Sequence, residues 1–252
     1  MYRDFADVFT LIKNTDLDAK TLRLDIHAQP NDETCGPTCL QAVYQYYDDF
    51  MPLEQTIAEV KTLKGGGTLA VMLGNHALAR GYEATIYTYN LQMFDPTWFH
   101  GEVDLVAKLT EQKQFKTAKK FQVAANSYLK FLSLGGQIKF EELNTKLIKR
   151  LLNEHTPILT GLSATYLYNC AREIGETNTY HDVQGEPTGH FVVIHGYDVA
   201  SKVAHIADPL EKNPISDKQH YRVSLQRLIN SILLGIVTYD ANLLVLAPKN
   251  HG

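Results

Sequence analysis

Hydrophobic positions in residues 1–155 recur mainly every three or four residues, which is the spacing of one face of a helix. The pattern is clearest after Cys35, where Leu40, Val43, Tyr44 and Tyr47 form one apolar stripe. The same periodicity predicts further helices at residues 53–63, at 69–82, within 95–136 and at 140–155. We therefore expect the first part of the chain to be largely helical.

The rest of the chain carries shorter apolar runs bounded by turn residues, which predict strands. We expect these strands at 156–168, 190–197, 202–209 and 242–248, with one earlier strand at 83–90 and one more helix at 223–235. Because helices come mainly first and strands mainly last, the order favours an α+β fold with an antiparallel sheet. We expect one domain over residues 1–252, with a helical part at about 30–155 and a sheet part at about 156–252.

Composition and charge exclude several classes of protein. The chain has 252 residues, 44% of them hydrophobic and 21% charged, with a formal net charge of -4, as is typical of a soluble globular protein. This charge creates no field that would recruit nucleic acid or an anionic membrane. Residues 1–20 lack the apolar segment of a secretory signal, and no apolar run approaches the ~18 residues of a membrane span. We therefore expect a cytoplasmic protein that binds neither nucleic acid nor membrane.

A cysteine stands at the predicted start of the first helix. If this helix begins near Gly36 and Pro37, the proline lies in the first turn, where its missing N–H costs nothing, and Cys35 lies at or just before the N-cap. The free amides and dipole of a helix N-terminus stabilise a thiolate there. Cys39, one turn later, is expected in the core. Since a free cysteine is more often a small buried residue, position alone does not make Cys35 a nucleophile.

A histidine and an aspartate are predicted to meet on neighbouring strands. A hairpin turn centred near Val199 places His190 opposite Asp208, and side-chain alternation puts His195 and His205 on the other face. A carboxylate that holds one imidazole nitrogen leaves the other nitrogen for a thiol. With Cys35, the pair forms a candidate catalytic triad.

A glutamine shortly before the cysteine completes the candidate site. Gln29 lies in a polar turn, from which its amide can reach the oxyanion of a tetrahedral intermediate beside the backbone N–H of Cys35. We also expect substrate contacts from Gly36 and Gly189, which adjoin the candidate nucleophile and base. Tyr168 and Asn169 precede a polar loop leading to the base, so they either line the substrate cleft or form an ordinary strand end and its turn.

Together, these residues resemble those of the papain-like cysteine peptidases, and most closely the bacteriocin-processing double-glycine peptidase family with its stand-alone relatives. The resemblance is carried by Gln29, CGPTCL from Cys35, the tyrosines at 46 and 47, GHFVVIHGYD from Gly189 and IADP from Ile206. It implies a papain-like fold, in which a helical subdomain presents the cysteine and an antiparallel sheet presents the histidine. It also implies the roles of oxyanion residue for Gln29, nucleophile for Cys35, base for His190 and orienter for Asp208.

The resemblance implies a peptide or amide substrate and a thioester acyl-enzyme, with no cofactor. Thr34 replaces the acidic residue common before the cysteine of transporter-linked members, and the chain has no ATP-binding cassette. A free-standing hydrolase or acyltransferase is therefore expected rather than an enzyme that removes double-glycine leaders.

Two other classes of function remain open at this stage. Cys35, Cys39 and histidines could bind a metal, but their spacing lacks the tight pairs of a zinc site, so we expect none. The chain could also be a binding module that keeps the fold without catalysis. The sequence identifies neither the substrate nor the oligomeric state.

Overall fold

The structure is a computed structural model that describes residues 18–64, 66–175 and 177–249. Most of the N-terminal segment in which we looked for a secretory signal therefore lies outside the described residues. Among the described residues, no helix is both long and apolar enough to cross a membrane.

The helices agree largely with the predicted periodicity. The α-helices are α1 (Cys35–Tyr46), α2 (Leu53–Glu59), α3 (Ala70–Ala79), α4 (Leu105–Phe115), α5 (Lys119–Ser133), α6 (Thr145–Asn153), α7 (Ala164–Tyr168) and α8 (Leu225–Leu234). Short 3-10 helices occur at η1 (Pro96–Phe99) and η2 (Gly235–Thr238). The strand predicted at 156–168 is wrong in its second half, because Ser163 caps a new helix by accepting a hydrogen bond from the backbone N–H of Tyr166 at 3.3 Å.

One mixed sheet forms the centre of the molecule. Its strands are β1 (Ala19–Thr21), β2 (Tyr82–Thr88), β3 (Gln137–Lys139), β4 (Ile158–Ser163), β7 (Gly189–Asp198), β8 (Val203–Ala207), β9 (His220–Ser224) and β10 (Asn242–Pro248). The spatial order is β3-β2-β10-β4-β7-β8-β9, and β1 pairs with β7. All neighbours are antiparallel except β2 and β3, so the α+β class is confirmed.

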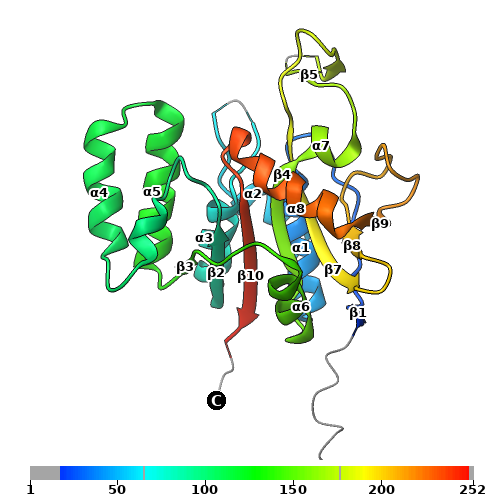
Figure 1. Cartoon of the computed structure of the whole chain (residues 1–252), viewed down its shortest axis with the longest axis horizontal. Helices are drawn as coiled ribbons and strands as arrows, with labels where there is room; N and C mark the ends of the chain where they lie inside the picture. Colours follow the sequence, from blue (N-terminus) through cyan, green and yellow to red (C-terminus); the bar gives the residue numbers. More distant parts are fainter. Residues whose placement is uncertain (1–17, 65, 176, 250–252) are drawn as a thin grey trace, which may run out of the picture.

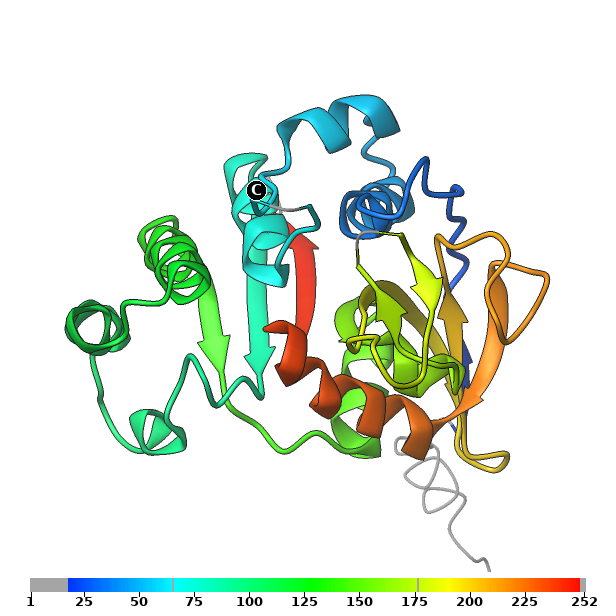
Figure 2. The same cartoon turned by 90° about the horizontal axis from the view of Figure 1, so that it is seen from above.

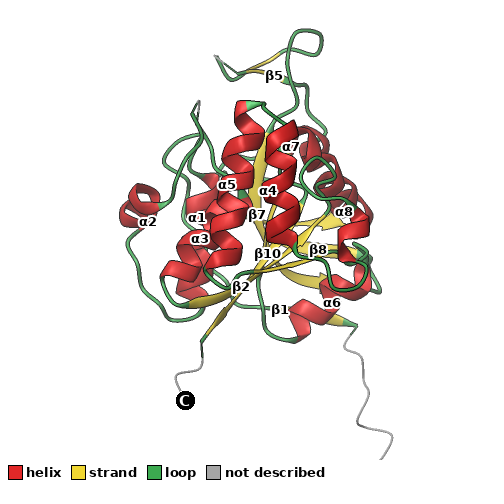
Figure 3. Cartoon of the chain, turned by 90° about the vertical axis from the view of Figure 1, so that its left-hand side faces the viewer, coloured by secondary structure: helices red, strands yellow, loops and turns green. Residues whose placement is uncertain are grey.

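Helices cover both faces of this sheet. One apolar cluster joins α1, α3 and α5 to one face, and a second joins α6, α7 and α8 to the other; Figure 1 and Figure 2 show the two layers. The expected division near residue 155 does not separate helices from strands, since β1, β2 and β3 precede it and still belong to the sheet. A small hairpin of β5 (Glu173–Ile174) and β6 (Thr179–Tyr180) projects from one end of the molecule (Figure 3).

The predicted register of the hairpin between β7 and β8 is wrong by about two residues. The last ladder pair is Val193 with Ala207, so His190 and Asp208 lie beyond the paired residues. The turn comprises residues 199–202, one residue later than expected, with the backbone N–H of Lys202 bonded to the carbonyl of Val199 at 3.1 Å. A β-bulge at residue 195 shifts the register once more.

Candidate active site

Cys35 is the first residue of α1 and Thr34 is the N-cap, so the helix begins slightly earlier than the expected start near Gly36 and Pro37. The backbone N–H of Thr38 bonds to the carbonyl of Thr34 at 3.0 Å, which closes the first helical turn, and Pro37 lies within that turn. The helix is fixed against the sheet by the Cys39 thiol, which donates to the carbonyl of Phe191 at 3.3 Å. Cys35 is 8% exposed and Cys39 is 0% exposed, so the expectation that Cys39 belongs to the core is confirmed.

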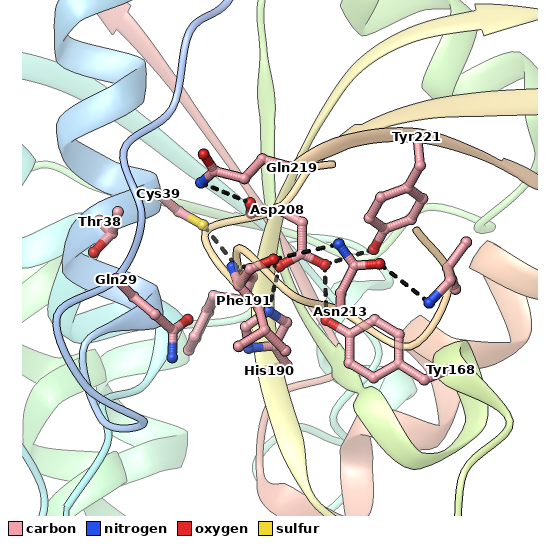
Figure 4. Close-up of polar contacts among 12 residues, drawn as sticks. Gln29, Thr38, Cys39, Tyr168, His190, Phe191, Asp208, Asn213, Gln219 and Tyr221 are labelled. Carbon is pink, nitrogen blue, oxygen red and sulfur yellow. Dashed lines mark hydrogen bonds and ion pairs between the residues drawn. The ribbon is translucent and has the colours of Figure 1, made fainter. Parts of the chain in front are cut away.

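His190 and Asp208 meet although they are not a ladder pair. Nε2 of His190 lies 2.8 Å from Oδ1 of Asp208, and the two residues are 8% and 0% exposed (Figure 4). Asp208 directly follows β8, and its backbone N–H bonds to the carbonyl of Gln219 at 2.8 Å, which ties it to the residue before β9. Because Nε2 is engaged with the carboxylate, Nδ1 is the nitrogen left for the thiol of Cys35.

The Asp208 carboxylate is saturated with hydrogen-bond donors. Oδ1 also accepts from the backbone N–H of Leu210 at 2.9 Å. Oδ2 accepts from the hydroxyls of Tyr168 at 2.7 Å and Tyr221 at 2.6 Å, which Figure 4 shows on the far side of Asp208 from α1. Such a set of donors stabilises the ionised form and fixes the position of the carboxylate.

In the buried site, His190 and Asp208 each stabilise the charged form of the other. Burial alone would lower the pKa of His190, but the charge of Asp208 and the hydrogen bonds that the imidazolium donates to Asp208 and to Cys35 raise it to about 10. Burial alone would raise the pKa of Asp208, but the charge of His190 and its hydrogen-bond donors lower it. The geometry therefore favours an imidazolium that bridges the carboxylate and the cysteine.

Gln29 lies beside this group and is tied to it through the backbone. Its N–H bonds to the carbonyl of Pro209 at 2.9 Å, next to Asp208. Its side-chain Nε2 donates to the carbonyl of Asn31 at 2.9 Å, and Figure 4 shows the side chain on the side facing His190. Since an amide nitrogen carries two hydrogens, one N–H remains to donate to a bound oxyanion.

Two cavities adjoin the imidazole of His190. One has a volume of about 190 Å³ and is also lined by Cys35, Thr68, Lys120, Thr238 and Asp240. The other has a volume of about 270 Å³ and is also lined by Gln29, Tyr168, Glu173, Tyr180 and Lys212. Space for a ligand therefore exists on both sides of the candidate base.

Of the residues expected to contact substrate, Gly189 and Tyr168 line a cavity beside His190, whereas Gly36 and Asn169 do not. Gly189 lines both cavities, and a Cβ at Gly36 would lie 2.5 Å from Cγ2 of Thr68, which leaves no room for a side chain. Tyr168 lines the second cavity, but its hydroxyl is occupied by Asp208. Asn169 lies apart, in the left-handed C-cap of α7, and lines a different cavity with Tyr166 and Leu234.

Two residues that line or contact the site, Tyr221 and Asp240, are not indicated by any sequence pattern. Tyr221 reaches Asp208 from β9, and Asp240 reaches the cavity beside Cys35 from the segment before β10. Neither belongs to a motif, and both depend on which strands become neighbours. Tyr221 lies on β9, which is the strand next to β8. A tyrosine on a neighbouring strand whose side chain is on the same face as Asp208 is the signal that could have identified it.

Of the histidines considered as possible metal ligands, His190 contacts Asp208, whereas His195 and His205 lie together elsewhere on the sheet. His195, His205 and His220 gather on the face opposite Ile194 and Ile206, with His195 and His220 rings 5.2 Å apart. Nδ1 of His195 and Nε2 of His220 are bonded to backbone carbonyls at 3.0 Å and 2.9 Å. Within residues 18–64, 66–175 and 177–249, no group of three or more His, Cys, Asp or Glu side chains is arranged to hold a metal ion.

Several solved structures are similar to the chain. A double-glycine motif protease from an AMS/PCAT transporter, in complex with a leader peptide, is 15% identical, covers 91% of this chain and 95% of its own, and has a TM-score of 0.44. The peptidase domain of Streptococcus ComA is 16% identical, with coverage of 90% and 99% and a TM-score of 0.41. Xylellain, a cysteine protease from Xylella fastidiosa, is 13% identical, with coverage of 93% and 87% and a TM-score of 0.45.

A search of curated proteins finds no match to the chain. A model of the Peptidase_C39 like family, in contrast, matches residues 21–230. The matched range spans most of the chain and includes the helix with Cys35 and the strands with His190 and Asp208. It confirms the resemblance on which the sequence-based expectation rests. The chain belongs to the Peptidase_C39 like family of cysteine peptidases.

Proposed function

We propose that the chain hydrolyses peptide or amide bonds through a thioester, with Cys35 as nucleophile, His190 as acid and base, Asp208 as orienter and Gln29 as oxyanion donor. One observation carries this proposal. His190 is held at 2.8 Å by a buried carboxylate through Nε2, and the same imidazole shares a cavity with Cys35 at the start of α1. This is the arrangement that a thiolate and imidazolium pair requires.

The first half of the reaction forms the acyl-enzyme. The Cys35 thiolate attacks the substrate carbonyl carbon, and the carbonyl oxygen becomes an oxyanion that accepts the N–H of Gln29 and the backbone N–H of Cys35. The imidazolium of His190 then donates its Nδ1 proton to the amide nitrogen. The C–N bond breaks, the amine leaves, and a thioester to Sγ remains.

The second half regenerates the enzyme with water. Neutral His190 takes a proton from a water molecule, whose oxygen attacks the thioester carbonyl. The C–S bond breaks, the thiolate of Cys35 returns beside the imidazolium, and the acid product leaves. Asp208 keeps its charge throughout and fixes the ring so that Nδ1 faces the reacting atoms.

We propose a peptide as the substrate, because cavities adjoin the imidazole on two sides and residues on each side of a scissile bond would need space. One of the similar solved structures holds a leader peptide. The proposed chemistry uses side chains of the chain alone and requires no cofactor.

The first experiment measures the reactivity of each cysteine. The parent and His190→Ala are alkylated with iodoacetamide over a range of pH, and each cysteine is quantified by mass spectrometry. Cys39 and Cys170 are internal controls, since burial raises the pKa of both thiols. We expect Cys35 to react at lower pH than both controls in the parent, and to lose this low-pH reaction in His190→Ala.

The result is then linked to hydrolysis with a library of randomised synthetic peptides. The parent should cut peptides and Cys35→Ser should not, while Cys39→Ser serves as the matched control for a buried thiol outside the site. If Cys35 reacts no faster than Cys39 at any pH, and His190→Ala changes nothing, the proposed catalytic pair is wrong.

A further inference from the structure

A buried carboxyl group that the proposed mechanism does not use lines the cavity beside the candidate nucleophile. Asp240 lies between η2 and β10 and is 6% exposed. It shares the cavity of about 190 Å³ with Cys35 and His190. A ligand that occupies this cavity would therefore contact both the thiol and the carboxyl group.

Only one oxygen of this carboxyl group has a structural role. Oδ1 accepts from the backbone N–H of Ala70 at 3.0 Å, at the start of α3, and from Nδ2 of Asn242 at 3.3 Å. Among the residues that the structure describes, none donates a hydrogen bond to Oδ2. The second oxygen is thus free for a bound ligand, while the first holds the carboxyl group in position.

Asp240 makes no ion pair within 4.0 Å with a described residue, although the charge of nearby Lys120 acts to lower its pKa. Lys120, which lines the same cavity, directs its Nζ toward the carbonyl of Thr238 at 3.4 Å and the ring of Tyr239 at 4.8 Å. It makes no ion pair with Asp240 within 4.0 Å. The remaining ionisable side chains that line the cavity are Asp32 and His190, besides the thiol of Cys35. Burial accordingly raises the pKa of Asp240 to about 7.

We propose that Asp240 is a specificity-determining residue that binds the basic side chain of a lysine or arginine near the scissile bond of a peptide substrate, through an ion pair with Oδ2. This inference rests on the proposed peptidase function. A cation would supply the partner that the buried carboxylate lacks, and the donors on Oδ1 hold the carboxylate in place before binding. Gly67 lines the cavity with no atom within 4 Å of the place where a side chain would begin, which leaves space for an aliphatic stem.

The test is the cleavage preference of the intact protein on a randomised synthetic peptide library, read by mass spectrometry. We compare the parent with Asp240→Asn, which keeps an oxygen to accept from Ala70 and removes the charge. The control is Glu102→Gln, an exposed acid in the loop before α4. We expect the parent to cut peptides with Lys or Arg at one position near the scissile bond about tenfold faster than peptides with Gln or Met there. The preference should disappear in Asp240→Asn and persist in Glu102→Gln.

A third variant tests the sign of the charge effect. Lys120→Gln removes the cation at the cavity, so we expect it to strengthen the preference for basic residues. Equal preferences in the parent and Asp240→Asn, or a preference that depends on Lys120 and not on Asp240, would overturn the inference. Circular dichroism confirms that each variant is folded before its preference is compared.

Failure of the inference and failure of the proposed function give different results. Cleavage that requires Cys35 but ignores basic residues overturns the role of Asp240 and leaves the peptidase function intact. If the parent cuts no peptide in the library, or if Cys35→Ser cuts as well as the parent, the peptidase function itself is wrong and the inference fails with it.

Discussion

Nε2 of His190 lies 2.8 Å from Oδ1 of Asp208, with both residues buried, although the ladder between β7 and β8 ends at Val193 and Ala207. The side chains of His190 and Asp208 therefore meet beyond the last pair of the ladder between β7 and β8, at the end of the sheet that faces the start of α1. At this end, two cavities adjoin His190, whereas the middle of the sheet is filled by apolar side chains. The position of the pair explains how a buried ion pair can still meet a substrate.

The first prediction concerns the carboxylate of this pair. Asp208→Asn removes the charge that holds the pKa of His190 near 10, so the imidazole should be largely neutral at pH 8. We expect peptide cleavage to fall by about 10²- to 10⁴-fold, and the low-pH alkylation of Cys35 to disappear. The titration of His190, followed by NMR in the parent and the variant, measures the cause directly. An unchanged histidine titration would contradict the assignment of Asp208 as its partner.

The second prediction concerns the two hydroxyls that hold Asp208. Tyr168→Phe and Tyr221→Phe each remove one donor from Oδ2. We expect each change to lower the free energy of unfolding by about 1.5–3 kcal/mol, the usual contribution of a hydrogen bond to a charged group. Denaturation in guanidinium measures this loss.

A matched control separates the loss of a tyrosine hydroxyl from an effect on the site. The hydroxyl of Tyr47 donates to the carbonyl of Leu246 at 2.8 Å, a neutral acceptor remote from Asp208. Tyr47→Phe should cost stability but leave the pH profile of Cys35 alkylation unchanged, whereas the two site variants should shift it. The same profile in all three variants would show that the tyrosines do not act on the pair.

The main features of the site were accessible from the sequence because they depend on local rules. A proline in the first turn marks the helix start at Cys35, and alternation along a strand decides the face of His190 and of Asp208. The alternation rule survives the error in register at this end of the hairpin, since the shift at Val193 and Ala207 is two residues and an even shift keeps a side chain on its face. The family resemblance added the order of the residues along the chain.

The parts that could not be predicted depend on contacts between distant segments. Tyr221 and Asp240 enter the site only because β9 lies beside β8 and because β10 lies between β2 and β4. A strand order of this kind follows from the packing of the whole sheet, and no local period encodes it. The helix α7 was missed for a local reason, because a capping serine ended an otherwise continuous apolar run.

The third prediction is the pH dependence of stability that the His190 and Asp208 pair produces. The pKa of His190 is raised to about 10 in the folded protein, so its contribution is complete below about pH 6.5, the unfolded value, and is lost as the pH rises toward 10. The pKa of Asp208 is lowered, so its contribution is complete above about pH 4 and is lost at lower pH. We expect the pair to stabilise the protein most between about pH 4 and 6.5.

Guanidinium denaturation of the parent and of the double variant His190→Gln, Asp208→Asn, at pH values from about 3 to 10, measures this contribution. The difference between the two proteins should be largest inside the window and decline on both sides of it. A difference that stays constant with pH would mean that the pair does not hold the charges assigned to it.

The fourth prediction concerns Asp240. Its contribution to stability changes with pH in the opposite direction to that of Asp208. Burial raises the pKa of Asp240 to about 7, so between about pH 4 and 7 the folded protein holds a proton that the unfolded chain has released. The parent should therefore lose stability as the pH rises through this range, by at most about 1.4 kcal/mol per pH unit from this group.

Asp240→Asn cannot titrate, and its stability relative to the parent should rise from pH 4 to 7 and then become constant. Glu102→Gln, which changes an exposed acid, is the control for the loss of one negative charge elsewhere on the protein. If Asp240→Asn also runs parallel to the parent, the carboxyl group is already ionised in the folded protein below neutral pH, and the expected rise in its pKa is wrong.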